Sequence, residues 1–362
     1  MLNTISNINN AVGGVVWGVF GISLLFIAGI VMTIVNKGFQ FFHLRHWLKE
    51  TIGAVFSDKH ITRHTEKEDK SISQFQSLCT ALAATIGTGN IVGVATAIIS
   101  GGPGAIFWMW IMAIFGMMTN YSENVLGIFY RRKNQKGEWS GGAMYYLRDG
   151  LGSKKHCKTL GKVLAVLFSC FCVLASFGIG NMSQTNSISG NMESAFGIPT
   201  YATGIFLVIL SAVVILGGLK RVAIVTEKVV PFMAIMYIVG ALAVCIAHIN
   251  MFGAVFAAIF KGAFGLKAVG GGILGYGIRL AITWGFKRGA FSNEAGLGSS
   301  VMVHSAADTP GPVQQGMYGI FECFADTIVI CTLTALTIIC SGVDINFGVK
   351  PGSELITAAF ST

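Results

Sequence analysis

The sequence has few charged residues. Of its 362 residues only 11% are charged, 53% are apolar, and the mean hydropathy is +0.68. Soluble domains carry roughly 25% charged residues. This shortage excludes an ordinary soluble domain and predicts an all-α polytopic membrane protein that lies in a lipid bilayer as a single domain over residues 1–362.

Proline is also scarce, and the cysteines follow no recognisable spacing pattern. Six prolines stand against 47 glycines, a balance that fits close helix packing in lipid. The eight cysteines follow neither a disulfide framework nor a zinc-site spacing. Because no Ser–His–Asp, Walker or paired-carboxylate pattern occurs, we expect no enzyme and no cofactor.

Basic residues are concentrated in two stretches. Residues 37–70 and 131–162 hold 16 of the 25 lysines and arginines. The positive-inside rule places both stretches in the cytoplasm, so the net charge of +9 does not indicate a nucleic-acid partner. The first 36 residues carry no charge, and a signal peptide would need a basic start. We therefore predict an external N-terminus followed by a first crossing.

Apolar segments long enough to cross the bilayer recur along the chain. Residues 251–263 are too short to span and predict an amphipathic helix on the outer face. Eight crossings are expected: 12–35, 75–99, 103–130, 160–187, 199–218, 226–248, 268–288 and 317–341.

The uncharged stretch Thr80–Gly116 contains the most informative motif, the GTGN segment at residues 87–90. Glycines on both sides of a threonine predict a break in a helix at membrane depth. Open backbone is tolerated there only where it lines a polar cavity. The two half-helix ends would face an anionic group and a cation. The motif therefore predicts a carboxylate-binding site beside a cation site.

Three blocks in this order resemble the alanine/glycine:cation symporters, also called the sodium:alanine symporter family. They are ATIGTGNIVGVATAI at 84–98, GGPGAIFWMWIMAIFG at 101–116 and KRGAFSNEAGLGS at 287–299. The resemblance implies a leucine-transporter-like inverted-repeat fold with one extra N-terminal helix. It also implies sodium-coupled uptake of alanine or glycine across the cytoplasmic (inner) membrane of a prokaryote. That core needs ten crossings and seven remain here, so truncation after the seventh core helix is expected.

The GTGN segment supplies the first group of candidate residues. Its N–H groups begin the second half-helix, where a carboxylate is favoured. The expected substrate-binding residues are Gly87, Thr88, Gly89 and Asn90. A glycine-rich packing face is the alternative interpretation. A dinucleotide fingerprint is excluded because the spacing is GxGxxxG and no strand precedes it.

Carbonyl oxygens at the end of the first half-helix suit sodium. The resemblance implies one cation site with Thr85 and Asn90 and another with Ala83 and Ile86. The metal candidates are thus Ala83, Thr85, Ile86 and Asn90.

A second half-site is expected in the seventh crossing. Inverted-repeat symmetry requires a break opposite the first one, and Gly285 is the predicted position. Trp284 and Phe286 would then close a small pocket over a methyl side chain. The alternative is an interfacial aromatic pair beside Lys287 and Arg288. The polar stretch that follows predicts a cytoplasmic gating segment.

The fourth crossing gives a third group of candidates at its outer half. Phe177 precedes Asn181 and Gln184, which lie three apart and share a helix face. These amides are expected to bind the substrate, and hydrogen bonding between helices is the alternative. Glu322 and Asp326 are placed near the inner end of the last crossing.

These inferences together predict a sodium-coupled symporter of small neutral amino acids. No acidic residue is expected beside GTGN, which favours sodium over protons. A proton-coupled carrier and a non-transporting amino-acid receptor are the alternatives. The sequence does not fix the oligomeric state, the stereoselectivity or the preference between alanine and glycine.

Overall fold

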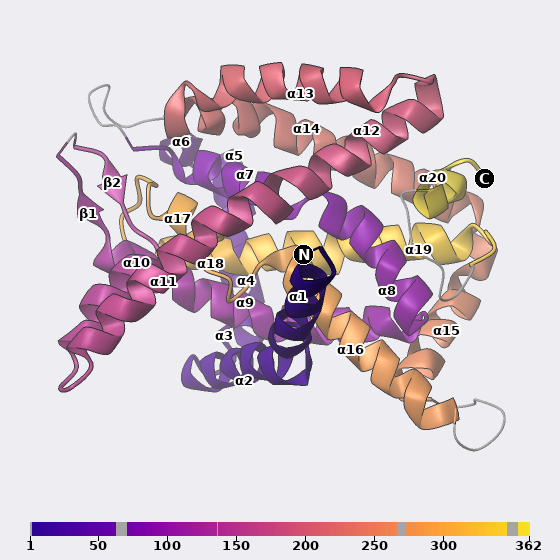
Figure 1. Cartoon of the computed structure of the whole chain (residues 1–362), viewed down its shortest axis with the longest axis horizontal. Coiled ribbons are helices and arrows are strands. Elements are labelled where there is room, and N and C mark those ends of the chain that lie inside the picture. The colour runs from indigo at the N-terminus through magenta and orange to yellow at the C-terminus, as the bar shows by residue number, and fades with distance from the viewer. Residues whose placement is uncertain (1, 63–70, 136, 266–272, 346–353) are drawn as a thin grey trace.

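The computed structural model consists of helices around a buried centre, with one short hairpin at the edge (Figure 1). It describes residues 2–62, 71–135, 137–265, 273–345 and 354–362. Within these ranges the strands β1 (Arg132–Lys133) and β2 (Trp139–Ser140) form the only sheet, with Arg132 opposite Ser140. The prediction of an α-helical membrane protein is confirmed.

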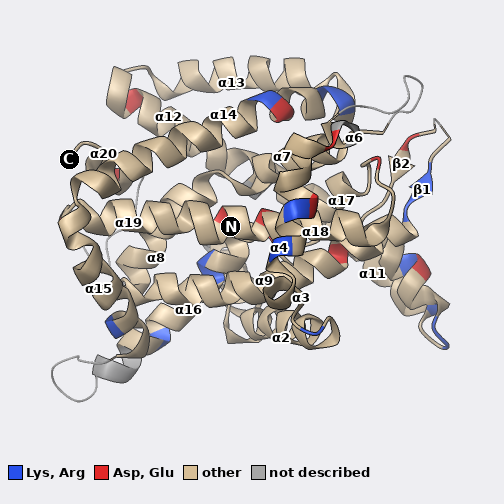
Figure 2. Ribbon diagram, turned by 180° about the vertical axis from the view of Figure 1, so that it is seen from behind, with Lys and Arg blue, Asp and Glu red and all other residues tan. Residues whose placement is uncertain are grey.

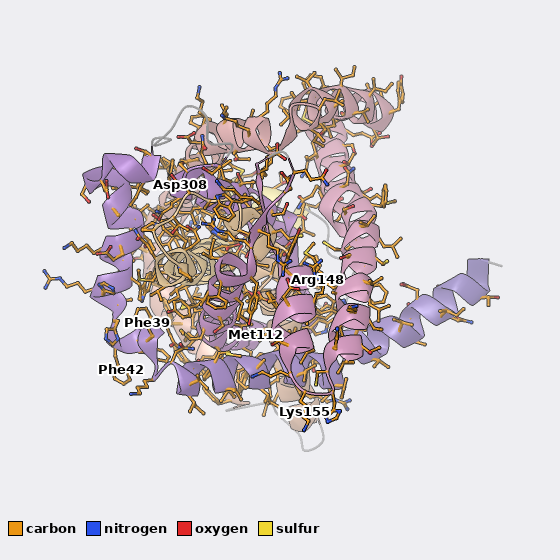
Figure 3. All side chains as sticks on the ribbon, turned by 90° about the vertical axis from the view of Figure 1, so that its left-hand side faces the viewer. Phe39, Phe42, Met112, Arg148, Lys155 and Asp308 are labelled. Carbon is orange, nitrogen blue, oxygen red and sulfur yellow. The ribbon has the colours of Figure 1, made fainter. Side chains whose placement is uncertain are left out.

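The N-terminal third contains the first crossing, a series of short helices and the broken helix. Their bounds are α1 (Leu2–Val16), α2 (Val19–Val35), α3 (Phe39–Phe42), α4 (Leu44–Leu48), η1 (Lys49–Gly53), α5 (Ala54–Ser57), α6 (Lys59–Thr62), α7 (Gln74–Thr85), η2 (Gly89–Gly93) and α8 (Val94–Gly101). Helix α2 packs on the body of the protein, whereas α1 extends away from it (Figure 3).

The middle third begins with a central helix and ends with the 251–263 segment. The bounds are α9 (Gly104–Tyr130), α10 (Ala143–Tyr145), η3 (Tyr146–Gly150), η4 (Leu151–Ser153), α11 (Lys158–Phe177), η5 (Gly178–Met182), α12 (Ser183–Phe196), α13 (Thr200–Ile215), α14 (Gly218–Ala247), η6 (Ile249–Met251) and α15 (Phe252–Phe264). Helices α11 and α12 form one long diagonal across the front of Figure 1.

The last third supplies the helices that face the break. They are α16 (Ile273–Asn293), α17 (Ser300–His304), α18 (Pro312–Cys323), η7 (Phe324–Cys331), α19 (Thr332–Cys340) and α20 (Glu354–Phe360). Helix α18 begins with Pro312 at its first turn, where the missing N–H costs nothing.

Helix α9 is the centre of the bundle, because α2, α15, α16 and α18 all pack against it. Its uncharged face is almost fully buried: Ile106, Met109, Met112 and Met118 are at most 2% exposed. Met112 lies among packed side chains in Figure 3, whereas Phe42 and Lys155 lie at the edge. Residues 104–122 of α9 carry no charge, so other helices can surround this part of α9 without leaving a charged group unpaired.

Among the described residues, five helices are long and apolar enough to cross a membrane, and the bent pair Gln74–Thr85 and Gly89–Gly101 would make a sixth. They cover the expected crossings 12–35, 75–99, 103–130, 160–187, 226–248 and 317–341. The segment 199–218 is the 16-residue helix α13. Residues 268–272 of the seventh expected crossing lie outside the described residues.

The segment 251–263 is helical as predicted, and its surroundings are now visible. Val255, Ile259 and Ala263 of α15 are at most 1% exposed, and α15 packs on α9 and α19. Backbones approach closely where Gly104 meets Gly262, since a Cβ atom at either glycine would collide with the other helix. One face of α15 is therefore part of the protein core.

Charged residues are sparse on the helices and gather toward the β1–β2 hairpin and the ends of α11 and α14 (Figure 2). Lys287 and Arg288 differ from this pattern. The sequence placed them at the start of an inner loop, but α16 continues to Asn293. Both basic side chains therefore lie within the helix, and this corrects the expected end of the seventh crossing.

The two halves of the broken helix have different partners. Helix α7 packs on α14, α17 and α18, whereas α8 packs on α9, α16 and α19. Ser73 and Gln76 form a capping box that fixes the start of α7. The break thus lies where two groups of helices meet.

Candidate functional site

The GTGN segment interrupts the helix as the sequence predicts. Helix α7 ends at Thr85, the π-helical turn η2 starts at Gly89, and the two halves are bent by 48°. The Asn90 Oδ1 atom accepts a 2.8 Å hydrogen bond from the Gly87 N–H, which closes the open turn. Asn90 is fully buried, so the break lies inside the protein and not at its lipid face.

A buried carboxylate lies beside the break. The Asn90 Nδ2 group donates to Asp326 Oδ1 at 2.6 Å and to the Asp326 carbonyl oxygen at 3.2 Å. Asp326 is in η7 and has no exposed surface. The expectation that no acidic residue adjoins GTGN was wrong, because the fold brings together two residues that are 236 positions apart.

Further polar side chains complete this group, which we name the Asp326 cluster. Thr327 Oγ1 donates to Asp326 Oδ2 at 2.7 Å, and Asn293 Nδ2 donates to Thr327 Oγ1 at 3.3 Å. The Ser292 hydroxyl lies 3.3 Å from the Cys331 sulfur. Its members are Asn90, Ser292, Asn293, Asp326 and Thr327. Such buried oxygen-rich sites suit hard cations, which prefer carboxylate, carbonyl and hydroxyl ligands.

The other residues of the expected sodium sites end the first half-helix. Thr85 is buried, and its hydroxyl lies 3.4 Å from the Ala81 carbonyl oxygen. Ile86 is half-buried, while Ala83 is exposed. Thr85 is five residues before Asn90, so its carbonyl is on the chain segment that leads into the Asp326 cluster. Sodium binding at Ala83, Thr85 and Ile86 stays a prediction.

Of the three residues expected from the fourth crossing, Gln184 reaches the break. The Thr88 N–H donates to Gln184 Oε1 at 3.3 Å, and the Gln184 amide lies against Gly87. Asn181 and Phe177 are exposed, and Asn181 contacts Thr185 of its own helix. The π-helical turn η5 separates α11 from α12 and changes which side chains share a face.

We expect Gln184→Ala to raise the KM for alanine about 10-fold, because a lost hydrogen bond to a charged carboxylate costs roughly 1.5–3 kcal/mol. Asn181→Ala is the matched control, one turn away and exposed, and it should leave the KM unchanged. Initial rates of radiolabelled alanine uptake measure both. An effect of Asn181→Ala equal to that of Gln184→Ala would contradict this assignment.

Helix α16 faces the break with residues that the sequence did not single out. A Cβ atom on Gly89 would lie 3.4 Å from the Ser292 Cα atom and 3.8 Å from the Phe291 ring. Phe286, by contrast, packs on Phe26 and Trp108. Phe291 is therefore the aromatic side chain of α16 that adjoins the GTGN segment.

The predicted break at Gly285 was wrong, since α16 is continuous through this residue. A side chain at Gly285 would collide with the Ala105 carbonyl and Trp108, so glycine is required here for close packing on α9. Trp284 contacts Gly101 of α8. The helix is interrupted later, by the turn at 294–299, where Glu294, Gly296 and Gly298 have positive φ.

Comparison with known proteins is consistent with this geometry. The family model described as "Sodium:alanine symporter family" matches residues 2–362. The chain belongs to the sodium:alanine symporter family. It is a polytopic membrane transporter and not an enzyme.

Named relatives of this symporter come from archaea and bacteria. The sodium/alanine symporter AgcS of Methanococcus maripaludis is 45% identical over 353 residues, or 97% of this chain and 74% of the relative. The amino-acid carrier protein AlsT of Bacillus subtilis is 41% identical over 75% of this chain and 56% of its own length. The uncharacterized transporter YaaJ of Escherichia coli is 36% identical over 96% of this chain and 70% of its own.

A second buried polar group of the symporter, the Glu322 cluster, lies one helical turn from Asp326. His304 Nε2 is 3.3 Å from Glu322 Oε2, which also accepts a 3.0 Å hydrogen bond from Asn120 Nδ2. Gln315 lies 2.7 Å from His304 Nδ1. The members are Ser77, Asn120, Ser300, His304, Gln315 and Glu322. The cluster joins α7, α9, α17 and α18 on the α7 side of the break.

The 294–299 turn of this symporter folds around a glutamate of α9. The Gly296 N–H donates to Glu123 Oε2 at 3.2 Å, and Ser299 donates to Glu294. Burial raises the pKa of Glu294, and the hydrogen bond from Ser299 partly offsets this effect. These contacts fix the turn to the central helix, and its function as a cytoplasmic gating segment stays a prediction.

Among the described residues, no group of three or more histidine, cysteine or acidic side chains could hold a metal ion. Sequence reasoning missed Asp326, Ser292 and Asn293 as partners of Asn90. The signal that existed was their polar nature within apolar helices, which marks functional positions in membranes.

Proposed function

We propose that the chain couples the inward flow of sodium to the uptake of alanine and glycine by alternating access. The observation that carries the proposal is the buried contact between Asn90, at the helix break, and Asp326. Open backbone ends for an anionic group lie here beside a carboxylate for a cation. The sodium/alanine symporter AgcS, which is 45% identical, supports the same assignment.

Sodium is assigned to the Asp326 cluster, next to the Thr85 carbonyl. A carboxylate at this depth has a high cost without a counter-charge. Asn90 Nδ2 and the Thr327 hydroxyl donate hydrogen bonds to Asp326, and these leave the negative charge itself uncompensated. A bound sodium ion would supply the compensation and would rotate the Asn90 amide so that its oxygen faces the ion.

The substrate carboxylate is assigned to the N–H groups of Thr88, Gly89 and Asn90. The Asn90 N–H donates a 3.2 Å hydrogen bond to the Gly87 carbonyl oxygen, which the carboxylate would have to replace. Gln184 Oε1 now accepts the hydrogen bond of Thr88. A carboxylate would replace this amide oxygen, and the Gln184 Nε2 group could then donate to the carboxylate. Helix starts favour negative charge, and the apolar surroundings strengthen this interaction.

The leucine-transporter-like arrangement of inverted repeats is part of the proposal. Its support is the 294–299 interruption after α16, because Ser292 and Asn293 directly before it adjoin the first break. An external N-terminus and a place in the cytoplasmic membrane of a prokaryote follow from the basic loops and the prokaryotic relatives.

Asp326 is also compatible with a second candidate function. A buried carboxylate beside the break could carry a proton in place of sodium, as expected of a proton-coupled carrier of small neutral amino acids. The amide, hydroxyl and carbonyl oxygens around it favour sodium, because they can act as ligands and a proton needs only one base.

Radiolabelled alanine uptake into proteoliposomes separates these functions. We expect accumulation with an inward sodium gradient and none when choline or potassium replaces sodium. Glycine should compete. Uptake driven by a pH gradient in choline would establish the proton-coupled carrier instead, and binding without accumulation would indicate a receptor.

Substitution of Phe291 tests whether its ring limits the size of the substrate side chain that the site accepts. We expect Phe291→Ala to let valine compete with alanine, because it removes the ring beside Gly89. One methylene group changes discrimination by only about 1–3 kcal/mol. The inhibition constant of valine against alanine uptake should therefore fall about 10-fold or more. Phe286→Ala and Trp284→Ala are the controls for the earlier assignment. A change in the competitor profile only with these two would place the pocket wall at the positions expected from the sequence.

A further inference from the structure

Arg288 is a half-buried charged residue of α16, and it has no function in the site described so far. Helix α16 extends five residues beyond Arg288 to Asn293. The aliphatic part of the Arg288 side chain lies against Gly93 of η2. Charged side chains at such positions are costly and usually serve function. Arginine stays protonated at every physiological pH, so its positive charge is permanent.

No acidic side chain in the described ranges lies within 4.0 Å of the Arg288 guanidinium nitrogens, and its Nε atom is buried without a hydrogen-bond partner. Its Cζ atom lies 5.5 Å from the ring centre of Trp284 and 5.6 Å from that of Phe291. These rings attract the cation, but they accept none of its five N–H donors in a directed way.

The position of Arg288 relative to the break follows from three contacts. The Arg288 Cδ atom is 3.9 Å from where a Cβ atom on Gly93 would lie, and Phe291 is 3.8 Å from the same point on Gly89. Because Trp284 contacts Gly101, α16 runs antiparallel to the second half-helix. Arg288 therefore lies about one turn beyond the break, on the α8 side.

We propose that Arg288 binds the carboxylate of an amino acid that approaches the break from the α8 side. This inference rests on the proposed function, in which the carboxylate finally reaches the N–H groups at residues 88–90. The planar guanidinium can hold both carboxylate oxygens at once, and Trp284 and Phe291 keep it from turning away. The ligand class is a zwitterion with a free carboxylate.

The Glu322 cluster is another buried polar group that has no function in the proposed site. Each of its side chains makes at least one hydrogen bond within the cluster, although Glu322 Oε1 and Gln315 Oε1 have no partner, whereas no hydrogen bond to a described residue is formed by the buried Nε atom of Arg288. The nearest permanent charge on α16 is Lys287, whose Nζ atom lies 5.1 Å from the Trp284 ring. Two adjacent cations without an acidic partner make an anionic ligand the natural complement.

The test compares alanine with alaninamide, in which a neutral amide replaces the carboxylate. Inhibition constants of both compounds are measured against radiolabelled alanine uptake for the wild type, Arg288→Met and Arg288→Lys. Arg279→Met is the matched control, because Arg279 is exposed on the same helix. Elution as a single peak from a sizing column in detergent checks the fold of each variant.

For Arg288→Met, the inhibition constant of alanine should rise about 10- to 100-fold, as for a lost charge-assisted hydrogen bond. The inhibition constant of alaninamide should change by no more than about twofold. Arg288→Lys keeps the positive charge but lacks the planar guanidinium group, so the inhibition constant of alanine should rise about 3- to 10-fold. Arg279→Met should match the wild type.

Equal rises in the inhibition constants of alanine and alaninamide, or no rise in either, would overturn the proposal and leave Arg288 as a packing residue. If Arg288→Met does not fold, the ratio of the two constants in Arg288→Lys decides in the same way. Absence of sodium-dependent uptake by the wild type and Arg279→Met would instead refute the proposed function, so the two failures are distinguishable.

Discussion

Gly89→Leu should abolish alanine binding while the protein still inserts and folds. A Cβ atom at this position would lie 3.4 Å from the Ser292 Cα atom and 3.5 Å from its hydroxyl, which is ordinary van der Waals contact, so there is room for a methyl group but not for the larger leucine side chain. A leucine would force α16 away and cover the N–H groups at the break. Overpacking alone costs about 1–3 kcal/mol, and with the blocked donors the loss should reach about 100-fold or more.

Binding of radiolabelled alanine to detergent-purified protein measures this effect. Gly204→Leu is the matched control, because no atom lies within 4 Å of a Cβ atom at this glycine of α13. It should bind alanine as the wild type does. Wild-type affinity in Gly89→Leu would show that GTGN is only a packing element.

Asp326→Asn should raise the sodium concentration that alanine binding requires. The substitution keeps the shape of a fully buried side chain and deletes its charge. Charge-assisted contacts are about twice as strong as neutral ones, so the sodium concentration for half-maximal binding should rise about 10-fold or more. Alanine binding titrated with sodium in a choline background gives this number.

Glu322→Gln provides the comparison, since Glu322 is equally buried one turn away but contacts His304 and Asn120. Its sodium dependence should stay that of the wild type. If Glu322→Gln raises the sodium concentration for half-maximal alanine binding and Asp326→Asn does not, the cation site belongs to the Glu322 cluster.

The first break could be predicted from the sequence because its cause is local. Two glycines within GTGN, in an uncharged stretch, leave few other structures for that backbone in a membrane. The helical class, the short helix α15 and the approach of Gln184 likewise followed from composition and spacing.

The partners of the break could not be predicted, because they come from distant segments. Nothing near Asn90 in the sequence points to Asp326, which meets it only when η7 packs against η2. Gly285 shows the converse difficulty. A glycine within a helix permits either a break or close packing, and only the position of Ala105 and Trp108 on α9 decides between them.

The different partners of α7 and α8 have a mechanical consequence. Helix α18 packs on α9 as well as on α7, and it continues through η7 into α19, which packs on α8. The 48° bend therefore joins two half-helices whose partner groups are themselves linked. A tilt of α7 about this bend would have to carry α18 across the surface of α9, and an amino acid with its ion bound at the break would resist that movement by holding both half-helices.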